Sequence, residues 1–270
     1  MQESASLWSF ESINQVGPMQ KFAPDFRFAR QVRCSPNHDE RMLSADMLLL
    51  HYTGMTSTAD AIERLCDPEA KVSSHYVVEE DGNVLQLVPE SRRAWHAGLS
   101  SWDGVSDTNS RSIGIEIANP GHSYGYPDFP EAQIVAVIAL CRDIVERHCI
   151  RAECVLAHSD VAPQRKLDPG EKFPWARLHG AGVGAWVTPS PTRPGTGLAP
   201  GDGGPDVAEL QAALRRYGYG IEASGVYDDV TAAVVTAFQR HFRAACIDGR
   251  ADRSTIETLQ ALLAASDRGR

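Results

Sequence analysis

The chain has 270 residues, 43% of them hydrophobic, so it can form one large domain or two unequal ones with packed cores. Its formal net charge of −9 and the absence of any Lys/Arg block exclude a basic surface for phosphate backbones, and we expect no nucleic-acid partner. No apolar run approaches the roughly 20 residues that a membrane-crossing helix needs, so we also expect no membrane span.

Two short apolar runs each end in a histidine. Residues 47–51 (Met-Leu-Leu-Leu-His) and 154–158 (Cys-Val-Leu-Ala-His) are typical of strands that are covered on both faces. The pattern therefore predicts that His51 and His158 lie at the ends of strands.

A helix and a hairpin are predicted after the first run. The helix covers about residues 58–65, with Ser57 or Thr56 as its N-cap. Two apolar runs, 76–80 and 83–88, flank an Asp-Gly pair, which predicts a hairpin with a two-residue turn.

The next predicted strand carries an acidic residue. Ile113, Ile115 and Ile117 alternate with Gly114 and Glu116. A strand has a period of two, so Glu116 is expected on the face opposite the isoleucines.

A longer helix is predicted where apolar residues recur at three- and four-residue steps from Ile134 to Val145. The preceding Asp128-x-x-Glu131 sequence predicts a capping box. The mixed order of strands and helices favours an α/β fold, α+β in some schemes, with a mixed central β-sheet flanked by helices.

The composition changes at residues 183–205, which are rich in Pro, Gly, Ser and Thr and form a predicted linker. It separates a first domain at residues 1–182, with an N-terminal extension at 1–30, from a second at 206–265. The second has three apolar stripes at helical spacing, which predict a small all-α three-helix domain.

The segment that begins at His158 contains further ligand-type residues, His158-Ser159-Asp160 and Lys166-Leu167-Asp168. Two imidazoles and one carboxylate would leave a fourth position on zinc for water, as in hydrolytic zinc sites. Spacing alone does not identify the ligands, because the chain has nine histidines and lone histidines are mostly structural or exposed.

Five motifs resemble, in order and spacing, those of the zinc-dependent N-acetylmuramoyl-L-alanine amidases over about residues 25–180. They are His51-Tyr52-Thr53-Gly54-Met55, Ser73-Ser74-His75-Tyr76, Ala94-Trp95-His96-Ala97-Gly98, Ser112-Ile113-Gly114-Ile115-Glu116, and His158-Ser159-Asp160 through Lys166-Leu167-Asp168-Pro169-Gly170. The second domain resembles the three-helix peptidoglycan-binding domain through Leu210-Gln211-x-x-Leu214, Gly225-x-x-Asp228-x-x-Thr231 and Ala237-Phe238-Gln239.

The resemblance implies a zinc hydrolase that cleaves the amide bond between N-acetylmuramic acid and L-alanine in peptidoglycan or anhydromuropeptides. It implies that His51, His158 and Asp168 bind Zn²⁺. It also implies that Glu116 moves the proton of the attacking water and that Lys166 stabilises the oxyanion. The alternatives are a salt-bridged or solvated strand acid at Glu116 and a surface lysine at position 166.

Four further residues are candidates for substrate binding. Trp95 and His96 lie in a predicted loop, where an indole face and an imidazole suit a sugar or a peptide. His75 is predicted to orient a ligand or the substrate, or else to be a satisfied histidine beneath the sheet. Asn119 is predicted to bind substrate amides, or simply to begin a turn.

Two other functions remain open at this point. A peptidoglycan-recognition protein that binds without cleaving is disfavoured, because all three ligand positions and the acid are filled. A structural zinc site is also disfavoured, because such sites usually have four protein ligands. The sequence predicts no oligomeric state.

The six cysteines include no C-x-x-C pair, so we expect free thiols in a reducing compartment. The first residues lack a basic and an apolar signal region, and we therefore expect a cytoplasmic protein. The alternative is the periplasm, which would suit a wall-binding domain if a signal had been removed.

Overall fold

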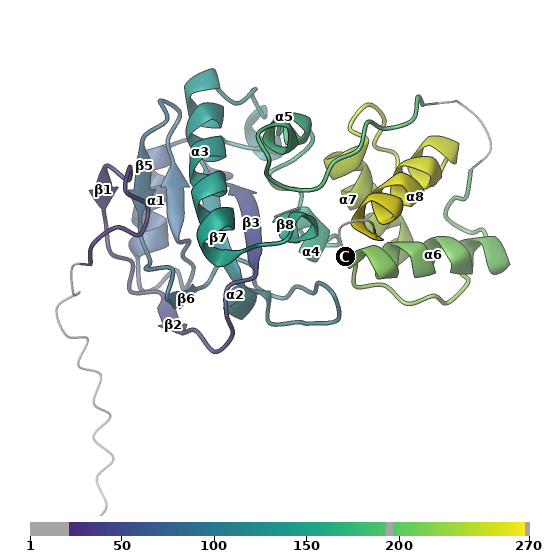
Figure 1. Ribbon diagram of the computed structural model, residues 1–270, viewed down its shortest axis with the longest axis horizontal. Helices are drawn as coiled ribbons and strands as arrows, with labels where there is room; N and C mark the ends of the chain where they lie inside the picture. Colours follow the sequence, from purple (N-terminus) through teal and green to yellow (C-terminus); the bar gives the residue numbers. More distant parts are fainter. Residues whose placement is uncertain (1–21, 193–196, 268–270) are drawn as a thin grey trace, which may run out of the picture.

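The computed structural model of the chain describes residues 22–192 and 197–267, so residues 1–21 of the predicted extension lie outside the described part. Figure 1 shows a sheet with helices around it, followed by three further helices. The strands are β1 (Gln31–Val32), β2 (His38–Glu40), β3 (Met47–Tyr52), β4 (Tyr76–Val78), β5 (Val84–Gln86), β6 (Arg92–Ala94), β7 (Ser112–Ile117) and β8 (Val155–Ala157). The helices are α1 (Thr58–Cys66), α2 (Thr108–Arg111), α3 (Glu131–His148), α4 (His158–Val161), α5 (Trp175–Gly180), α6 (Pro205–Tyr217), α7 (Asp229–Phe242) and α8 (Arg253–Asp267).

The central sheet has the strand order β1-β5-β4-β7-β3-β8. Strand β3 pairs in parallel with β7 and β8, whereas β4 and β5 are antiparallel, so the predicted mixed sheet is confirmed. Strands β2 and β6 form a separate two-stranded sheet. In the β3–β7 pair, His51 lies opposite Glu116, so the ends of two central strands bring these residues together.

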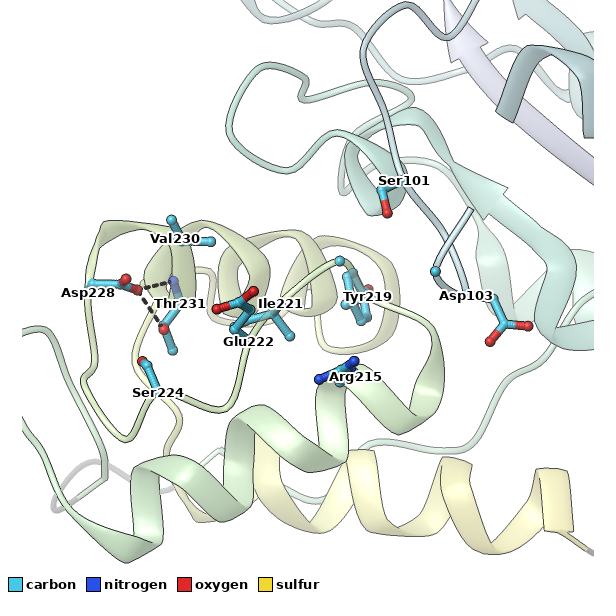
Figure 2. A pocket seen from close by; sticks show the side chains of 12 residues that line it. Ser101, Asp103, Arg215, Tyr219, Ile221, Glu222, Ser224, Asp228, Val230 and Thr231 are labelled. Atoms are coloured by element: carbon cyan, nitrogen blue, oxygen red, sulfur yellow. Dashed lines mark hydrogen bonds between the residues drawn. The ribbon is translucent and has the colours of Figure 1, made fainter. Parts of the chain in front are cut away.

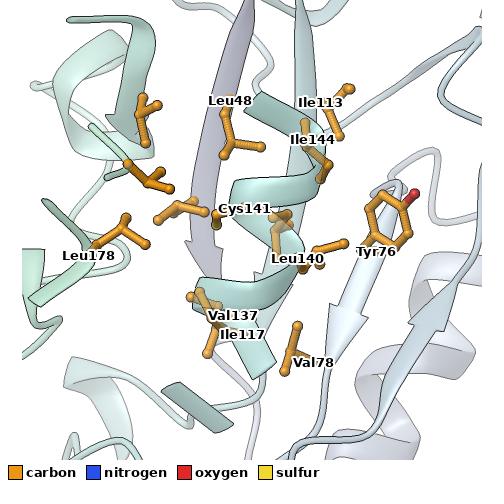
Figure 3. Close-up of a cluster of buried hydrophobic side chains, with 14 of the residues drawn as sticks. Leu48, Tyr76, Val78, Ile113, Ile117, Val137, Leu140, Cys141, Ile144 and Leu178 are labelled. Atoms are coloured by element: carbon orange, nitrogen blue, oxygen red, sulfur yellow. The ribbon is translucent and has the colours of Figure 1, made fainter. Parts of the chain in front are cut away.

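Helix α3 covers one face of the sheet. Figure 3 shows its apolar side chains over the strands, where they meet Leu48, Ile113 and Ile117. Each such side chain stabilises the fold by roughly 1.5–3 kcal/mol when it is fully buried. The isoleucines of β7 therefore face α3, as the alternation predicts.

The opposite face of the sheet is covered by two different parts of the chain. Helix α1 packs Ile62 and Leu65 over the β4–β5 side. Met47 and Leu49 of β3 and Leu156 of β8 instead belong to a buried cluster that continues into the C-terminal helices. Glu116 and His51 lie on this face because they alternate with residues that face α3.

The C-terminal unit consists of α6, α7 and α8, as predicted. Helices α7 and α8 both begin with an aspartate N-cap. Asp228 accepts a hydrogen bond from the backbone N–H of Thr231 at 2.9 Å, and Asp252 accepts one from the backbone N–H of Thr255 at 2.8 Å. An aspartate at the N-cap satisfies a helix N–H group that has no partner within the helix.

Two local predictions are wrong in detail. The predicted hairpin exists, but its loop has three residues, because Glu79 N–H donates to Asn83 O and Gly82 N–H donates to Glu79 O. Gly82 completes this turn with a φ of +86°. Asp128 does not form a capping box, because Pro130 is the N-cap of α3 and no side chain caps it.

The predicted Ser57 cap of α1 is confirmed, because the Ser57 hydroxyl accepts a hydrogen bond from Asp60 N–H at 3.2 Å.

No helix in the described ranges is both long and apolar enough to cross a membrane. All six cysteines lie in these ranges, and all are unbridged.

Candidate active site

Two strand ends and one loop bring the three predicted metal ligands together. His51 lies near the end of β3, His158 follows β8 as the first residue of α4, and Asp168 follows in the next loop. His51 Nδ1 lies 2.9 Å from His158 Nδ1 and 3.0 Å from Asp168 Oδ2. His158 Nδ1 is also 3.0 Å from Asp168 Oδ2. The three side chains thus place one nitrogen or oxygen atom each around a single point.

A chain of hydrogen bonds fixes where the proton of His51 lies. Ser112 Oγ–H donates to the backbone oxygen of Thr108 at 2.5 Å, so Ser112 accepts from His96 Nε2–H at 3.3 Å. His96 Nδ1 is then an acceptor, and it lies 3.0 Å from His51 Nε2. His51 therefore carries its proton on Nε2 and leaves the Nδ1 lone pair free.

His158 is fixed in the same way by a backbone carbonyl. Its Nε2–H donates to Ala97 O at 3.0 Å, and a carbonyl oxygen can only accept. When both imidazoles are neutral, both Nδ1 atoms and Asp168 Oδ2 are acceptors that face one another within about 3 Å. Such a group is repulsive unless a cation lies among its atoms, so these residues fit a metal ion.

The electrostatics also favour the protonation states that bind metals. Burial, and then the His158 imidazole, lower the pKa of His51 to about 4, so His51 is neutral near pH 7. Burial alone would raise the pKa of Asp168, but His158 and His51 outweigh it and hold this pKa well below its usual value. A neutral imidazole and an ionised carboxylate are the forms that coordinate metals.

Glu116 lies beside this group with an unsatisfied oxygen. Its Oε2 atom is buried and has no hydrogen-bond partner among the described residues. Burial, reinforced by the negative charge of Asp168, raises the pKa of Glu116 well above its ordinary value, and Lys166 only partly opposes this. A raised pKa and an unused acceptor are properties of a carboxyl group that exchanges protons with a substrate or water.

A cavity of about 370 Å³ opens over the metal-ligand group. The three predicted ligands line it together with Glu116, Lys166, Trp95 and His96. Trp95 is half-buried, and its indole N–H donates to Asp39 Oδ2 at 2.7 Å, which fixes the ring at the cavity wall. The structure thus gathers seven of the nine residues predicted from the sequence around one cavity.

The remaining two predicted residues lie outside this cavity lining. His75 is fully buried, its Nδ1 accepts from Gly114 N–H at 2.9 Å, and burial followed by Arg41 lowers its pKa to about 3. Asn119 uses its amide to hold a turn, with Nδ2–H bonded to Pro127 O and Oδ1 to Gly121 N–H. Substrate binding by His75 and Asn119 stays a prediction. The hydrogen bonds described above for both residues are made to backbone groups of the protein.

Gly114 gives the His96 ring the space that it needs. A Cβ atom at position 114 would lie 2.6 Å from Cγ and from Nδ1 of His96, which is closer than real side chains pack. His96 is 9% exposed and cannot move aside without losing its bond to His51.

We therefore expect Gly114→Ala to lower the free energy of unfolding of the metal-free protein by about 1–3 kcal/mol, as overpacking does. Urea denaturation of the variant and the wild type measures this. Gly180→Ala is the matched control, because a Cβ at position 180 meets nothing within 4 Å. Equal urea midpoints for the two glycine variants would contradict the expected clash.

The cavity is also lined by one positively charged side chain that no sequence pattern predicts at the site. Arg64 of α1 lines it and is exposed. The sequence predicts α1, but nothing in the local pattern indicates that the C-terminal end of this helix lies at the cavity.

A second, larger cavity of about 760 Å³ lies between the loop at 101–104 and the C-terminal unit (Figure 2). None of the nine predicted site residues lines it. The Asp228 carboxylate lines this cavity and is the N-cap of α7. It accepts hydrogen bonds from the N–H and hydroxyl groups of Thr231.

Comparison with protein families gives two matches. The N-acetylmuramoyl-L-alanine amidase model matches residues 41–171, and a peptidoglycan-binding domain model matches residues 203–259. The N-acetylmuramoyl-L-alanine amidase AmiD of Escherichia coli is 41% identical over 236 residues, which cover 80% of this chain and 82% of AmiD.

Two solved structures are similar over most of the chain. Escherichia coli AmiD in complex with its substrate anhydro-N-acetylmuramic acid-L-Ala-D-gamma-Glu-L-Lys has a TM-score of 0.70 at 37% identity, with 86% of this chain and 93% of AmiD covered. AmpDh3 of Pseudomonas aeruginosa in complex with anhydromuramic pentapeptide has a TM-score of 0.72 at 32% identity, with 87% and 96% covered.

Proposed function

This chain belongs to the N-acetylmuramoyl-L-alanine amidase family, and we propose that it cuts the amide bond between N-acetylmuramic acid and L-alanine with a zinc ion held by His51, His158 and Asp168. The observation that carries the proposal is the convergence of three potential ligand atoms, His51 Nδ1, His158 Nδ1 and Asp168 Oδ2, beside the buried Glu116 carboxyl group.

The donor set supports zinc as the metal. Two imidazole nitrogens and one carboxylate oxygen are a typical set for catalytic zinc, which keeps one further position open for water or substrate. When bound, zinc would act as a Lewis acid on the amide and lower the pKa of water to about 7. Hydrogen bonds from the ligands to His96 and to Ala97 O fix the imidazole orientations, as the partners of metal-bound histidines commonly do.

Two side chains of the cavity carry the remaining chemistry. Glu116 takes the proton from the attacking water and delivers it to the leaving amine of L-alanine. Lys166, on the loop that carries Asp168, lies where its ammonium group can stabilise negative charge on the amide oxygen.

The walls of the cavity suit a muropeptide. The Trp95 indole offers an apolar face for a sugar or a stem peptide, and the Arg64 guanidinium suits a carboxylate of the stem peptide. The ligands in the two solved relatives are anhydromuropeptides, which supports the proposal that this chain accepts them.

We propose that the catalytic unit ends near residue 182, that residues 183–205 link the two units, and that residues 206–265 bind peptidoglycan. The match of residues 203–259 to a peptidoglycan-binding domain supports this division. We also propose a cytoplasmic location, because six unbridged thiols suit a reducing compartment.

Product analysis tests the function directly. The zinc-loaded protein is incubated with purified cell-wall sacculi and, separately, with soluble anhydromuropeptides, and the products are identified by mass spectrometry. We expect peptides with a free L-alanine amino terminus and sugars that keep their lactyl group. Tight binding without any cleavage of either substrate would instead indicate a recognition protein.

A further inference from the structure

The C-terminal unit packs against the catalytic unit, with α7 next to α4, the short helix that begins with His158. Met47, Leu49 and Leu156 of the sheet share one buried cluster with Val234 and Phe238 of α7. Units of one chain that meet through polar surfaces tend to move relative to each other, whereas a large apolar interface fixes them. The shared apolar cluster therefore favours a fixed relative position of the two units.

A buried carboxylate of the catalytic unit lies in this interface. Asp160 of α4 is fully buried, and it accepts hydrogen bonds from two side chains of the C-terminal unit. Tyr219 Oη–H donates to Oδ1 at 2.7 Å, and His241 Nδ1–H donates to Oδ2 at 2.7 Å. The same Oδ2 accepts from the backbone N–H of Ala157 at 2.8 Å.

Aromatic rings hold both donors in place. The His241 ring is stacked on Trp175 of the catalytic unit at 3.7 Å and on Phe242 at 3.8 Å. The Tyr219 ring contacts Trp102 edge to face at 5.0 Å. Tyr219 is 1% exposed and His241 is 2% exposed, so water cannot replace either bond.

Asp160 is two residues from His158 on the same short helix. Its bond to Ala157 N–H fixes the backbone immediately before His158. Ser159 N–H, between the two, donates to the backbone oxygen of Asp168 at 3.0 Å. The backbone that presents two of the three ligand side chains is thus tied to the carboxylate that the C-terminal unit holds.

We propose that the C-terminal unit positions the metal ligands, with Tyr219 and His241 holding the Asp160 carboxylate and Asp160 holding the turn that carries His158. The unit is then part of the active-site scaffold as well as a wall-binding module. Asp160, Tyr219 and His241 are positioning residues, since none of them lines the cavity at the metal ligands. The inference rests on the proposed function, because it requires His158 to bind the metal.

The test compares two buried tyrosines of the C-terminal unit. Tyr219→Phe removes a bond to Asp160, whereas Tyr227→Phe removes an equally buried 2.7 Å bond to Gly249 O within the unit itself. The Zn²⁺ dissociation constant of each full-length variant is measured by competition with a chromophoric chelator. The absorption spectrum of the Co²⁺-loaded protein reports the ligand geometry.

We expect Tyr219→Phe to weaken Zn²⁺ binding roughly tenfold, as the loss of a group that orients a ligand does, and to change the Co²⁺ spectrum. Tyr227→Phe should destabilise the fold but keep both metal readouts. His241→Phe preserves the stacked ring and removes the second donor to Asp160, so it should behave like Tyr219→Phe. It provides the test if Tyr219→Phe does not fold.

Wild-type Zn²⁺ affinity and Co²⁺ spectrum in Tyr219→Phe or His241→Phe would overturn the inference, as would an equal loss of affinity in Tyr227→Phe. A wild-type protein that binds no Zn²⁺ would instead refute the proposed metal site itself. The two failures are therefore distinguishable.

Discussion

Glu116→Gln should lower kcat by about 10²–10⁴-fold, because the amide has the shape of the carboxyl group but cannot accept the proton of water. The three predicted metal ligands are unchanged, so the variant should bind the same amount of Zn²⁺ as the wild type. The measurement is steady-state release of L-alanine-terminated peptide, together with the metal content of the purified protein.

Stability separates this effect from a folding defect. Glu116 Oε2 is buried without a hydrogen-bond partner, so replacing the acid removes the cost of burying a charge there. The metal-free variant should therefore unfold at the same or a higher temperature than the wild type. Full activity in a folded, metal-loaded variant would eliminate Glu116 as the base.

The pH profile of the wild type gives a further check on the same group. Only the ionised carboxylate accepts a proton, so kcat/KM should fall as the pH drops through the pKa of Glu116. Burial raises this pKa, so the fall should begin at a higher pH than for an exposed glutamate. This acidic limb should be absent from the residual activity of Glu116→Gln.

Loss of the metal should have an equally large effect. His158→Ala, or removal of the metal with a chelator, should lower the turnover by on the order of 10³-fold or more, because metal catalysis supplies several kcal/mol. Metal content and turnover are measured in parallel, and added Zn²⁺ should restore the chelated wild type but not the variant.

Ser159→Ala is the matched control for this experiment. Ser159 is the buried neighbour of His158 on α4, and its hydroxyl has no hydrogen-bond partner among the described residues. We expect this variant to keep its metal and its activity. Stoichiometric Zn²⁺ and normal turnover in His158→Ala would remove His158 from the ligand set.

The sequence predicts those parts of the fold whose signals are local. The alternation of Ile113, Ile115 and Ile117 places Glu116 on the face opposite the isoleucines, and the apolar runs that end near His51 and His158 correspond to β3 and β8. These signals depend only on the period of a strand. Two predictions were wrong, the length of the hairpin loop and the cap of α3. They depend on turn geometry and on Pro130, and a short stretch of sequence is compatible with several turn and cap conformations.

The site was predictable where a motif keeps its residues close in sequence, but not where contacts join distant segments. His96 belongs to a recognisable motif, yet its bond to His51 arises only when the loop folds over Gly114 of β7. Arg64 reaches the cavity only because α1 packs beside it. Asp160 lies within the final motif, but its partners are 59 and 81 residues further along the chain.

The shared cluster beneath β3 and β8 also bears on protein engineering. A fusion that exchanges the last three helices for an unrelated carbohydrate-binding domain would remove Tyr217 and Tyr219 from Trp102, expose part of the shared apolar cluster and so promote aggregation, whatever the length of the connecting peptide. Chimaeras of this enzyme therefore need either the native partner surface or polar replacements on that side of the sheet.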